Sequence, residues 1–85
     1  MVKAAVQEAV IKLTSVDDVK VFCEIACKYE FDIDIRNLDR HYPLDAKSLM
    51  CLFTLDLRNP LIVSVVSTDK EVGCFFNTIS QFLVD

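Results

Sequence analysis

The sequence has little glycine or proline and no tryptophan: one Gly and two Pro occur among 85 residues. Disordered segments and flexible linkers are rich in Gly and Pro, so the composition excludes a disordered chain. Long apolar runs are also missing, and those at 60–63 and 65–66 are far too short to span a bilayer. No basic segment followed by an apolar stretch opens the sequence, so we expect a cytoplasmic protein without a membrane partner.

Clusters of positive charge are missing too. Nine Lys and Arg stand against 13 Asp and Glu, the net charge is −4, and the basic residues are scattered. Nucleic-acid binding needs grouped Lys and Arg to contact phosphates, so we expect no nucleic-acid partner. What the chain does have is apolar residues, at 53%. Together with the length, this predicts one small domain, 1–85, with a packed core.

The four cysteines are Cys23, Cys27, Cys51 and Cys74. Cys23 and Cys27 are four positions apart, which places them on one face of a helix. None of the four has the C-x-x-C spacing typical of a zinc site. Each lies in an apolar segment, where cysteine behaves as a small hydrophobic residue. We therefore predict buried thiols, no metal and no cofactor.

Hydrophobic periodicity predicts the element order β-α-β-β-α-β-α. We expect strands at 4–13, 31–36, 40–44 and 61–67, and helices from 16 to about 29, from 46 to about 53, and from 72 to about 83. The composition of 4–13 also suits a helix, but its alternation favours a strand. Pro43 restricts its strand to a sheet edge, whereas 61–67 is apolar on both faces, as a covered central strand would be. The order predicts an α+β two-layer sandwich with helices on one face of an antiparallel sheet.

Capping residues mark the expected helix starts. Asp45 is expected to cap the second helix, and Thr68-Asp69-Lys70-Glu71 has the pattern of a capping box for the third. The first helix follows Ser15-Val16-Asp17-Asp18. This segment could be a chemical site or only a cap, because both are common at the point where a polar turn meets an apolar helix.

Residues 46–57 read A-K-S-L-M-C-L-F-T-L-D-L. This segment resembles the regulatory-serine region of the histidine-containing phosphocarrier protein (HPr) family of the bacterial sugar phosphotransferase system. The element order is similar to that family over nearly the whole chain. The resemblance implies an HPr-like open-faced sandwich with four antiparallel strands and three helices. It also implies phosphotransferase-system proteins, or a carbon-catabolite regulator, as partners.

In that family the phosphoryl-accepting histidine lies just before the first helix, followed by an arginine and a proline. Here Ser15, Val16, Asp17 and Asp18 occupy that place, and all three family residues are missing. Phosphoryl transfer needs a nucleophile and positive charge around the incoming group, whereas two carboxylates would repel it. We therefore interpret the segment as a helix cap, with Asp18 reaching back from the third helical position.

His41 is the only histidine, and with no second imidazole to complete a site we interpret it as a surface residue. Ser48 lies at the start of the second helix. The resemblance implies that it is the serine modified by a dedicated kinase, while the alternative is a residue that only helps to start the helix. These two interpretations stay open.

Leu49, Met50 and Phe53 form an apolar face separate from Leu52 and Leu55. A short helix on a sheet cannot bury both faces, and exposed apolar patches mark partner sites. We expect this face, with Lys47 beside it, to bind protein partners. The alternatives are burial under a loop or pairing in a homodimer.

The leading hypothesis is a divergent HPr-like protein, not an enzyme, that has lost phosphohistidine transfer and regulates sugar uptake or carbon-source genes by binding proteins. A phosphocarrier that uses another acceptor is one alternative. A small-molecule sensor domain is another, because β-α-β-β-α-β is also the ferredoxin-like order. Such sensors usually have Gly-rich loops, and the lone Gly73 lies inside the last predicted helix.

Overall fold

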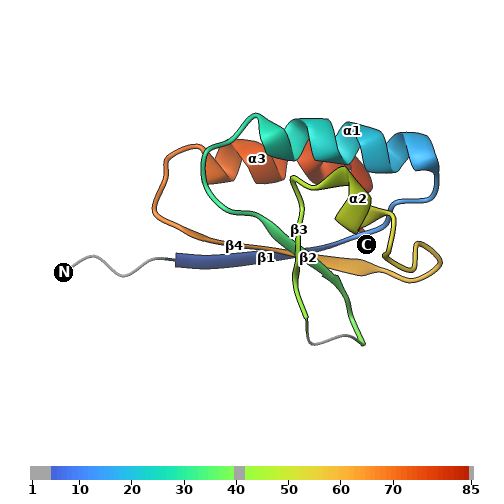
Figure 1. The fold of residues 1–85 in the computed structure, drawn as a ribbon. Helices are drawn as coiled ribbons and strands as arrows, with labels where there is room; N and C mark the ends of the chain where they lie inside the picture. Colours follow the sequence, from blue (N-terminus) through green and yellow to red (C-terminus); the bar gives the residue numbers. More distant parts are fainter. Residues whose placement is uncertain (1–4, 40–41, 85) are drawn as a thin grey trace.

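The computed structural model describes residues 5–39 and 42–84. The elements, shown in Figure 1, are β1 (Ala5–Ile11), α1 (Val16–Cys27), β2 (Asp34–Asn37), β3 (Leu44–Asp45), α2 (Leu49–Leu52), β4 (Leu61–Ser67), α3 (Val72–Thr78) and the 3₁₀ turn η1 (Ile79–Phe82). The predicted α+β order is confirmed. Among these described elements, no helix has both the length and the apolar character needed to cross a membrane.

The four strands form one antiparallel sheet in the order β1-β4-β2-β3. β4 is central and pairs with β1 over seven residues, from Ala5 opposite Ser67 to Ile11 opposite Leu61. β3 lies at an edge, as Pro43 predicted. The helices α1 and α3 lie side by side over one face of the sheet, and α2 lies on the same side (Figure 1). The predicted open-faced arrangement is confirmed.

The core lies between the sheet and the helices. Phe22 of α1 is fully buried, with its ring centroid 6.4 Å from those of Phe75 and Phe82. From the sheet, Val63 and Ile35 belong to the same buried cluster as these rings. Each such side chain contributes about 1.5–3 kcal/mol by leaving water. Burial of these side chains holds the two layers together.

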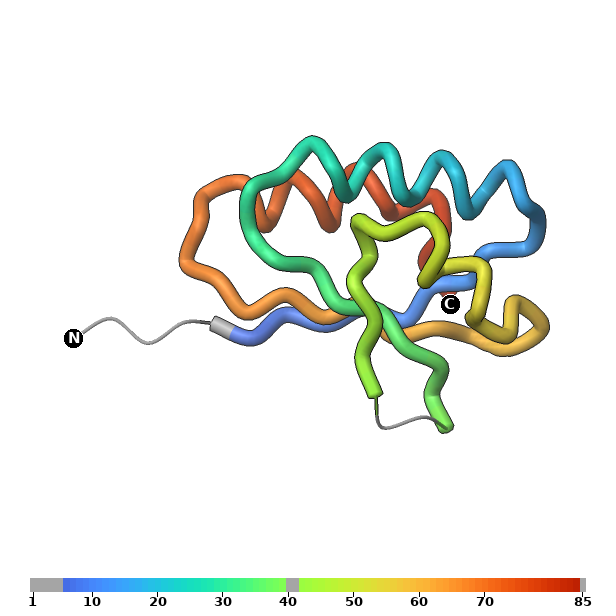
Figure 2. The backbone as a smooth tube through the Cα atoms, in the orientation of Figure 1, coloured from blue at the N-terminus to red at the C-terminus, as the bar shows by residue number. Residues whose placement is uncertain are grey.

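None of the helices described in residues 5–39 and 42–84 covers the other face of the sheet. Along β4, Leu61, Val63 and Val65 are buried while the residues between them are half-buried, so the expectation of a strand covered on both faces is wrong. Val6 and Val66 lie directly opposite each other on the open face, 63% and 58% exposed. Figure 2 shows the chain that follows β2 and the chain that leads into β3 projecting from the sheet on the side away from the helices.

Three strands are shorter than predicted, and β1 already ends at Ile11 instead of residue 13. The β2 strand begins at Asp34 and not at Phe31, although the hydrogen bond from the Ala46 amide to the Ile33 carbonyl (2.9 Å) continues the register of β2 and β3 by one residue. Phe31 and Ile33 are nevertheless buried, so the alternation was correct for burial. The described part of the third strand is Leu44–Asp45, and Arg40 and His41 lie outside the described residues.

The prediction that Asp45 caps the second helix is wrong. Asp45 belongs to β3, opposite Asp34, and its carboxylate accepts a hydrogen bond from the Lys47 amide (2.9 Å). The N-cap of α2 is Ser48, three residues later, and the helix ends at Leu52. Asp45 therefore lies in the sheet, three residues before the N-cap that α2 uses.

The capping box predicted at 68–71 does not form. The Glu71 amide donates to the carboxylate of Asp69 (2.8 Å), and Glu71 itself becomes the N-cap without a side-chain capping bond. The apolar stripe that follows is correct for burial at Val72, Phe75 and Ile79. It continues through η1 into a short bridge between Leu83 and Ile11, so the last part is not α-helix as predicted.

Candidate functional site

The start of α1 is closed by its own side chains. Ser15 has extended backbone angles, and its Oγ accepts a hydrogen bond from the Asp18 amide (3.1 Å). The Asp18 carboxylate accepts from both the amide and the hydroxyl of Thr14, at 3.1 and 2.9 Å. The cap predicted at Ser15 is confirmed. Asp18 reaches back as predicted, but to Thr14 instead of to the Ser15 amide.

The electrostatics of this helix start do not suit an incoming phosphoryl group. Asp17 and Asp18 lie in the first turn of α1, where carboxylates are stabilised by the helix dipole. Val16, the first helical residue, is 53% exposed and offers no polar atom on its side chain. The only histidine of the chain, His41, lies outside the described residues, and its role as a surface residue stays a prediction.

The start of α2 is built differently. Ser48 is a half-buried N-cap in extended conformation, and its side chain makes no capping hydrogen bond. Its carbonyl accepts the first helical bond, from the Leu52 amide at 3.1 Å. The first-turn amides of α2 therefore receive no acceptor from the Ser48 side chain.

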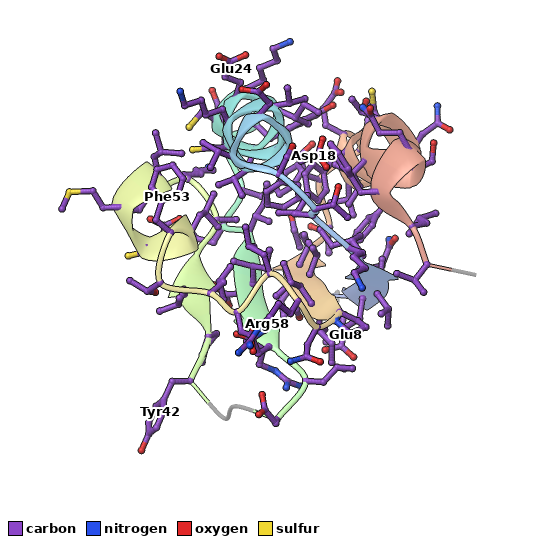
Figure 3. All side chains as sticks on the ribbon, turned by 90° about the vertical axis from the view of Figure 1, so that its right-hand side faces the viewer. Glu8, Asp18, Glu24, Tyr42, Phe53 and Arg58 are labelled. Carbon is purple, nitrogen blue, oxygen red and sulfur yellow. The ribbon has the colours of Figure 1, made fainter. Side chains whose placement is uncertain are left out.

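Three apolar side chains point outward from α2 and its C-cap: Leu49, Met50 and Phe53 are 36%, 83% and 47% exposed. We call them the α2 face. Leu52, on the opposite side of the helix, is fully buried, and Leu55 beyond it is also in the core. Figure 3 shows Phe53 on the outside of the α2 segment, well away from Glu8 on the sheet. The predicted separation of two apolar faces is thus present in the structure.

Lys47 ties this helix to the end of α1. Its ammonium donates to the carbonyl of Tyr29 at 2.6 Å, and the side chain is half-buried. The bond links the segment before α2 to the loop after α1, so part of the donor capacity of Lys47 is used inside the chain. A role for Lys47 in partner binding stays a prediction.

A hollow of about 350 Å³ lies between α1 and α2. Its lining is mainly apolar and consists of Lys20, Cys23, Glu24, Cys27 and Leu49. Sequence reasoning missed this hollow. The signal was present in the four-residue spacing of the two cysteines, which places both on the side of α1 that faces α2.

The prediction that all four thiols are buried is wrong. Cys23 is buried, Cys51 is half-buried, and Cys27 and Cys74 are exposed. The Sγ atoms of Cys23 and Cys27 lie 3.6 and 3.5 Å from one acceptor, the carbonyl oxygen of Lys47. Burial, and then the neighbouring Cys27, raise the pKa of the Cys23 thiol. Within the described ranges 5–39 and 42–84, no group of three or more His, Cys, Asp or Glu side chains is arranged to hold a metal ion.

No protein-family model matches the sequence, and no curated protein matches it either. Solved structures do. HPr-C-His from Thermoanaerobacter tengcongensis is similar at a TM-score of 0.66 and 15% identity, over 88% of each chain. The phosphocarrier protein HPr from Bacillus anthracis is similar at a TM-score of 0.66 and 13% identity, over 94% of this chain and 96% of the other. The likeness favours HPr over the ferredoxin-like alternative: the chain has the HPr fold.

Proposed function

We propose that this chain is an HPr-like protein that does not carry phosphohistidine and acts, without enzymatic activity, by binding protein partners through the α2 face. One observation carries the proposal: on the HPr fold, the start of α1 is closed by Ser15 and Asp18 while the apolar face of α2 stays exposed. The partners that the resemblance implies are proteins of the sugar phosphotransferase system or a carbon-catabolite regulator.

The chemistry at α1 supports the loss of transfer. A phosphoryl acceptor needs a nucleophile activated by a base and donors for the developing negative charge. The hydroxyl of Ser15 accepts a backbone hydrogen bond, and no imidazole follows it in the first turn. Asp17 and Asp18 add two negative charges. A phosphoryl group approaching this point would meet repulsion and no activated nucleophile.

The packing of α2 supports docking. Leu52 is fully buried on the core side of the helix, and the Lys47 ammonium, just before the helix, donates a hydrogen bond to the Tyr29 carbonyl. The exposed side chains therefore stand on a backbone that is already held in place. This lowers the entropic cost of ordering the surface when a partner binds. Exposed clusters of large apolar residues on small proteins commonly mark partner sites.

Ser48 is the proposed point of regulation. Its side chain makes no capping bond, and the Asp45 carboxylate binds the Lys47 amide instead of the first-turn amides of α2. A phosphate on Ser48 would therefore not compete with Asp45 for those donors, although the two negative charges would still repel. It would place a dianion next to Leu49 and so change which partner docks.

The test compares charge on the α2 face with charge elsewhere. Met50→Asp and Phe53→Asp should abolish binding to the general phosphotransferase enzyme or to a catabolite regulator, measured by calorimetry, with little change in melting temperature. Val66→Asp on the open sheet face is the matched control, since Val66 is also apolar and exposed. Loss of binding with Val66→Asp alone would move the docking surface to the sheet, and self-association lost with Phe53→Asp would favour the homodimer.

Two further measurements separate the remaining alternatives. Incubation with phosphoenolpyruvate and the general phosphotransferase enzyme should give no acid-labile phosphate by mass spectrometry. Labelling that disappears with His41→Ala would show instead a phosphocarrier with another acceptor. Ser48→Asp should leave stability nearly unchanged and alter partner affinity; a large melting shift with unchanged affinity would mean that Ser48 serves only as a cap.

A further inference from the structure

We propose that Cys23 and Cys27 form a binding site for a single thiophilic metal ion, with Cu(I) as the chemical class that fits. The two thiols lie one helical turn apart on α1, at the wall of the hollow that separates α1 from α2. This inference does not rest on the proposed function, because it concerns a different pair of side chains and a different ligand.

The positions of the sulfur atoms carry the argument. Both lie within 3.6 Å of the same oxygen, the Lys47 carbonyl, so both point to one place between the two helices. Both cysteines also line the hollow between α1 and α2, whose surface is mainly apolar. Two convergent soft donors in an apolar surrounding match the preference of thiolate sites for soft cations.

A direct disulfide between these residues is disfavoured by geometry. Residues four apart in a helix have Cβ atoms about 5–6 Å apart, whereas a disulfide needs about 3.5–4.5 Å. Closing the bond would require α1 to distort around the buried Cys23. An ion between the two sulfurs adds the length of two metal–sulfur bonds to the bridge, which removes this mismatch.

The number of donors selects the metal. Zinc is held almost always by four ligands, and the part of the chain that the structure describes offers no group of three His, Cys, Asp or Glu side chains. Cu(I) accepts two thiolates in a nearly linear arrangement and does not need more. On binding, each thiol releases its proton: two S–H groups and Cu(I) give a bis-thiolate complex of charge −1 and two protons. Lys20, which lines the hollow, supplies an opposing positive charge, partly offset by Glu24.

The site is tested on the whole, reduced chain under anaerobic conditions, by titration with Cu(I) against a competing Cu(I) chelator and by native mass spectrometry. We expect one copper per monomer, with loss of two protons from the complex mass. Cys27→Ser and Cys23→Ala should each remove the binding, while Cys51→Ser and Cys74→Ser should leave it unchanged. Cys27 is exposed, so its replacement keeps the test valid if loss of Cys23 weakens the fold.

Three results would overturn the inference. Copper retained at the same affinity by Cys27→Ser would place the ion elsewhere. Copper found only in a dimer would make it an intermolecular bridge and not a site of this helix. Binding of Zn²⁺ to the monomer with equal affinity and the same dependence on both cysteines would show a site with further ligands and exclude the two-coordinate assignment.

Discussion

The starts of α1 and α2 differ although a serine is the N-cap of both. At α1, the Ser15 hydroxyl accepts from the Asp18 amide, and Asp18 in turn binds Thr14. At α2, the Ser48 side chain makes no capping bond, and exposed apolar residues follow at once. The start of α1 is thus capped by a side chain of its own N-cap residue, whereas the start of α2 is not.

This difference bears on where the molecule can change state. A cap that uses its hydrogen bonds internally contributes to stability, and altering it costs free energy of folding. A serine that contributes no such bond can be modified at little cost to the fold. The contrast supports the proposal that Ser48 is the regulated residue, while Ser15 is engaged in capping α1.

The largest effect is expected from the support beneath α2. A four-residue helix is far too short to be stable alone, so it depends on burial of Leu52. Leu52→Ala should lower the free energy of unfolding by about 2–5 kcal/mol, as measured by urea denaturation. Met50→Ala, on the exposed side, should change it by less than about 0.5 kcal/mol. Similar losses for both would mean that the α2 face is packed and not available for docking.

The comparison of the two serines gives a smaller effect. Ser15→Ala should destabilise the protein by about 1 kcal/mol through loss of the bond to the Asp18 amide. Ser48→Ala should fall within a few tenths of a kcal/mol of the parent protein, because no capping bond is lost. Equal destabilisation by the two substitutions would remove the contrast between the helix starts. Both values can be read from the same denaturation experiment at constant pH.

The smallest effect concerns Asp34 in β2, the strand that pairs with β3. Burial, followed by the nearby Asp32 and Asp45, raises the pKa of Asp34. In the range between the pKa of an unfolded Asp and this raised pKa, the folded state binds more protons, so stability falls as pH rises. Asp34→Asn should therefore stabilise the protein slightly at neutral pH, and the gain should vanish as pH is lowered through that range.

Asp56 provides the control of opposite sign. Hydrogen bonds from Arg58 lower the pKa of Asp56, so its contribution to stability is present at neutral pH and is lost as pH falls. Asp56→Asn should therefore destabilise at neutral pH. Thermal melts at several pH values measure both variants, and a stabilising effect of Asp34→Asn that grows toward acid would contradict the argument.

The sequence predicted those parts of the fold in which one local signal had no competitor. The alternation of 31–36 predicted which of its side chains are buried, and the apolar stripe after Ser15 predicted the helix α1; both predictions are confirmed. At α2, both Asp45 and Ser48 are residue types that cap helices. Ser48 is the N-cap, because Asp45 pairs with Asp34 of another strand. Local sequence contains no information about that pairing.

The candidate site shows the same limit. The exposure of Leu49, Met50 and Phe53 follows from helix geometry, and so it was predictable. The convergence of Cys23 and Cys27 on the Lys47 carbonyl depends on how α2 is placed against α1. Spacing within α1 gave the shared face of the two cysteines, but only the packed structure shows what that face meets.

The central position of β4 determines the order in which the chain can acquire its structure. Each residue of β1 pairs with a residue at least 50 positions further along the chain. One edge of β2 also pairs with β4. During synthesis the first strand therefore has no partner until Leu61–Ser67 has emerged. Closing such a long loop is entropically costly, and folds dominated by distant pairings fold slowly. We expect the sheet to assemble only after the chain is nearly complete, which leaves α1, with its self-sufficient cap, as the element best able to form early.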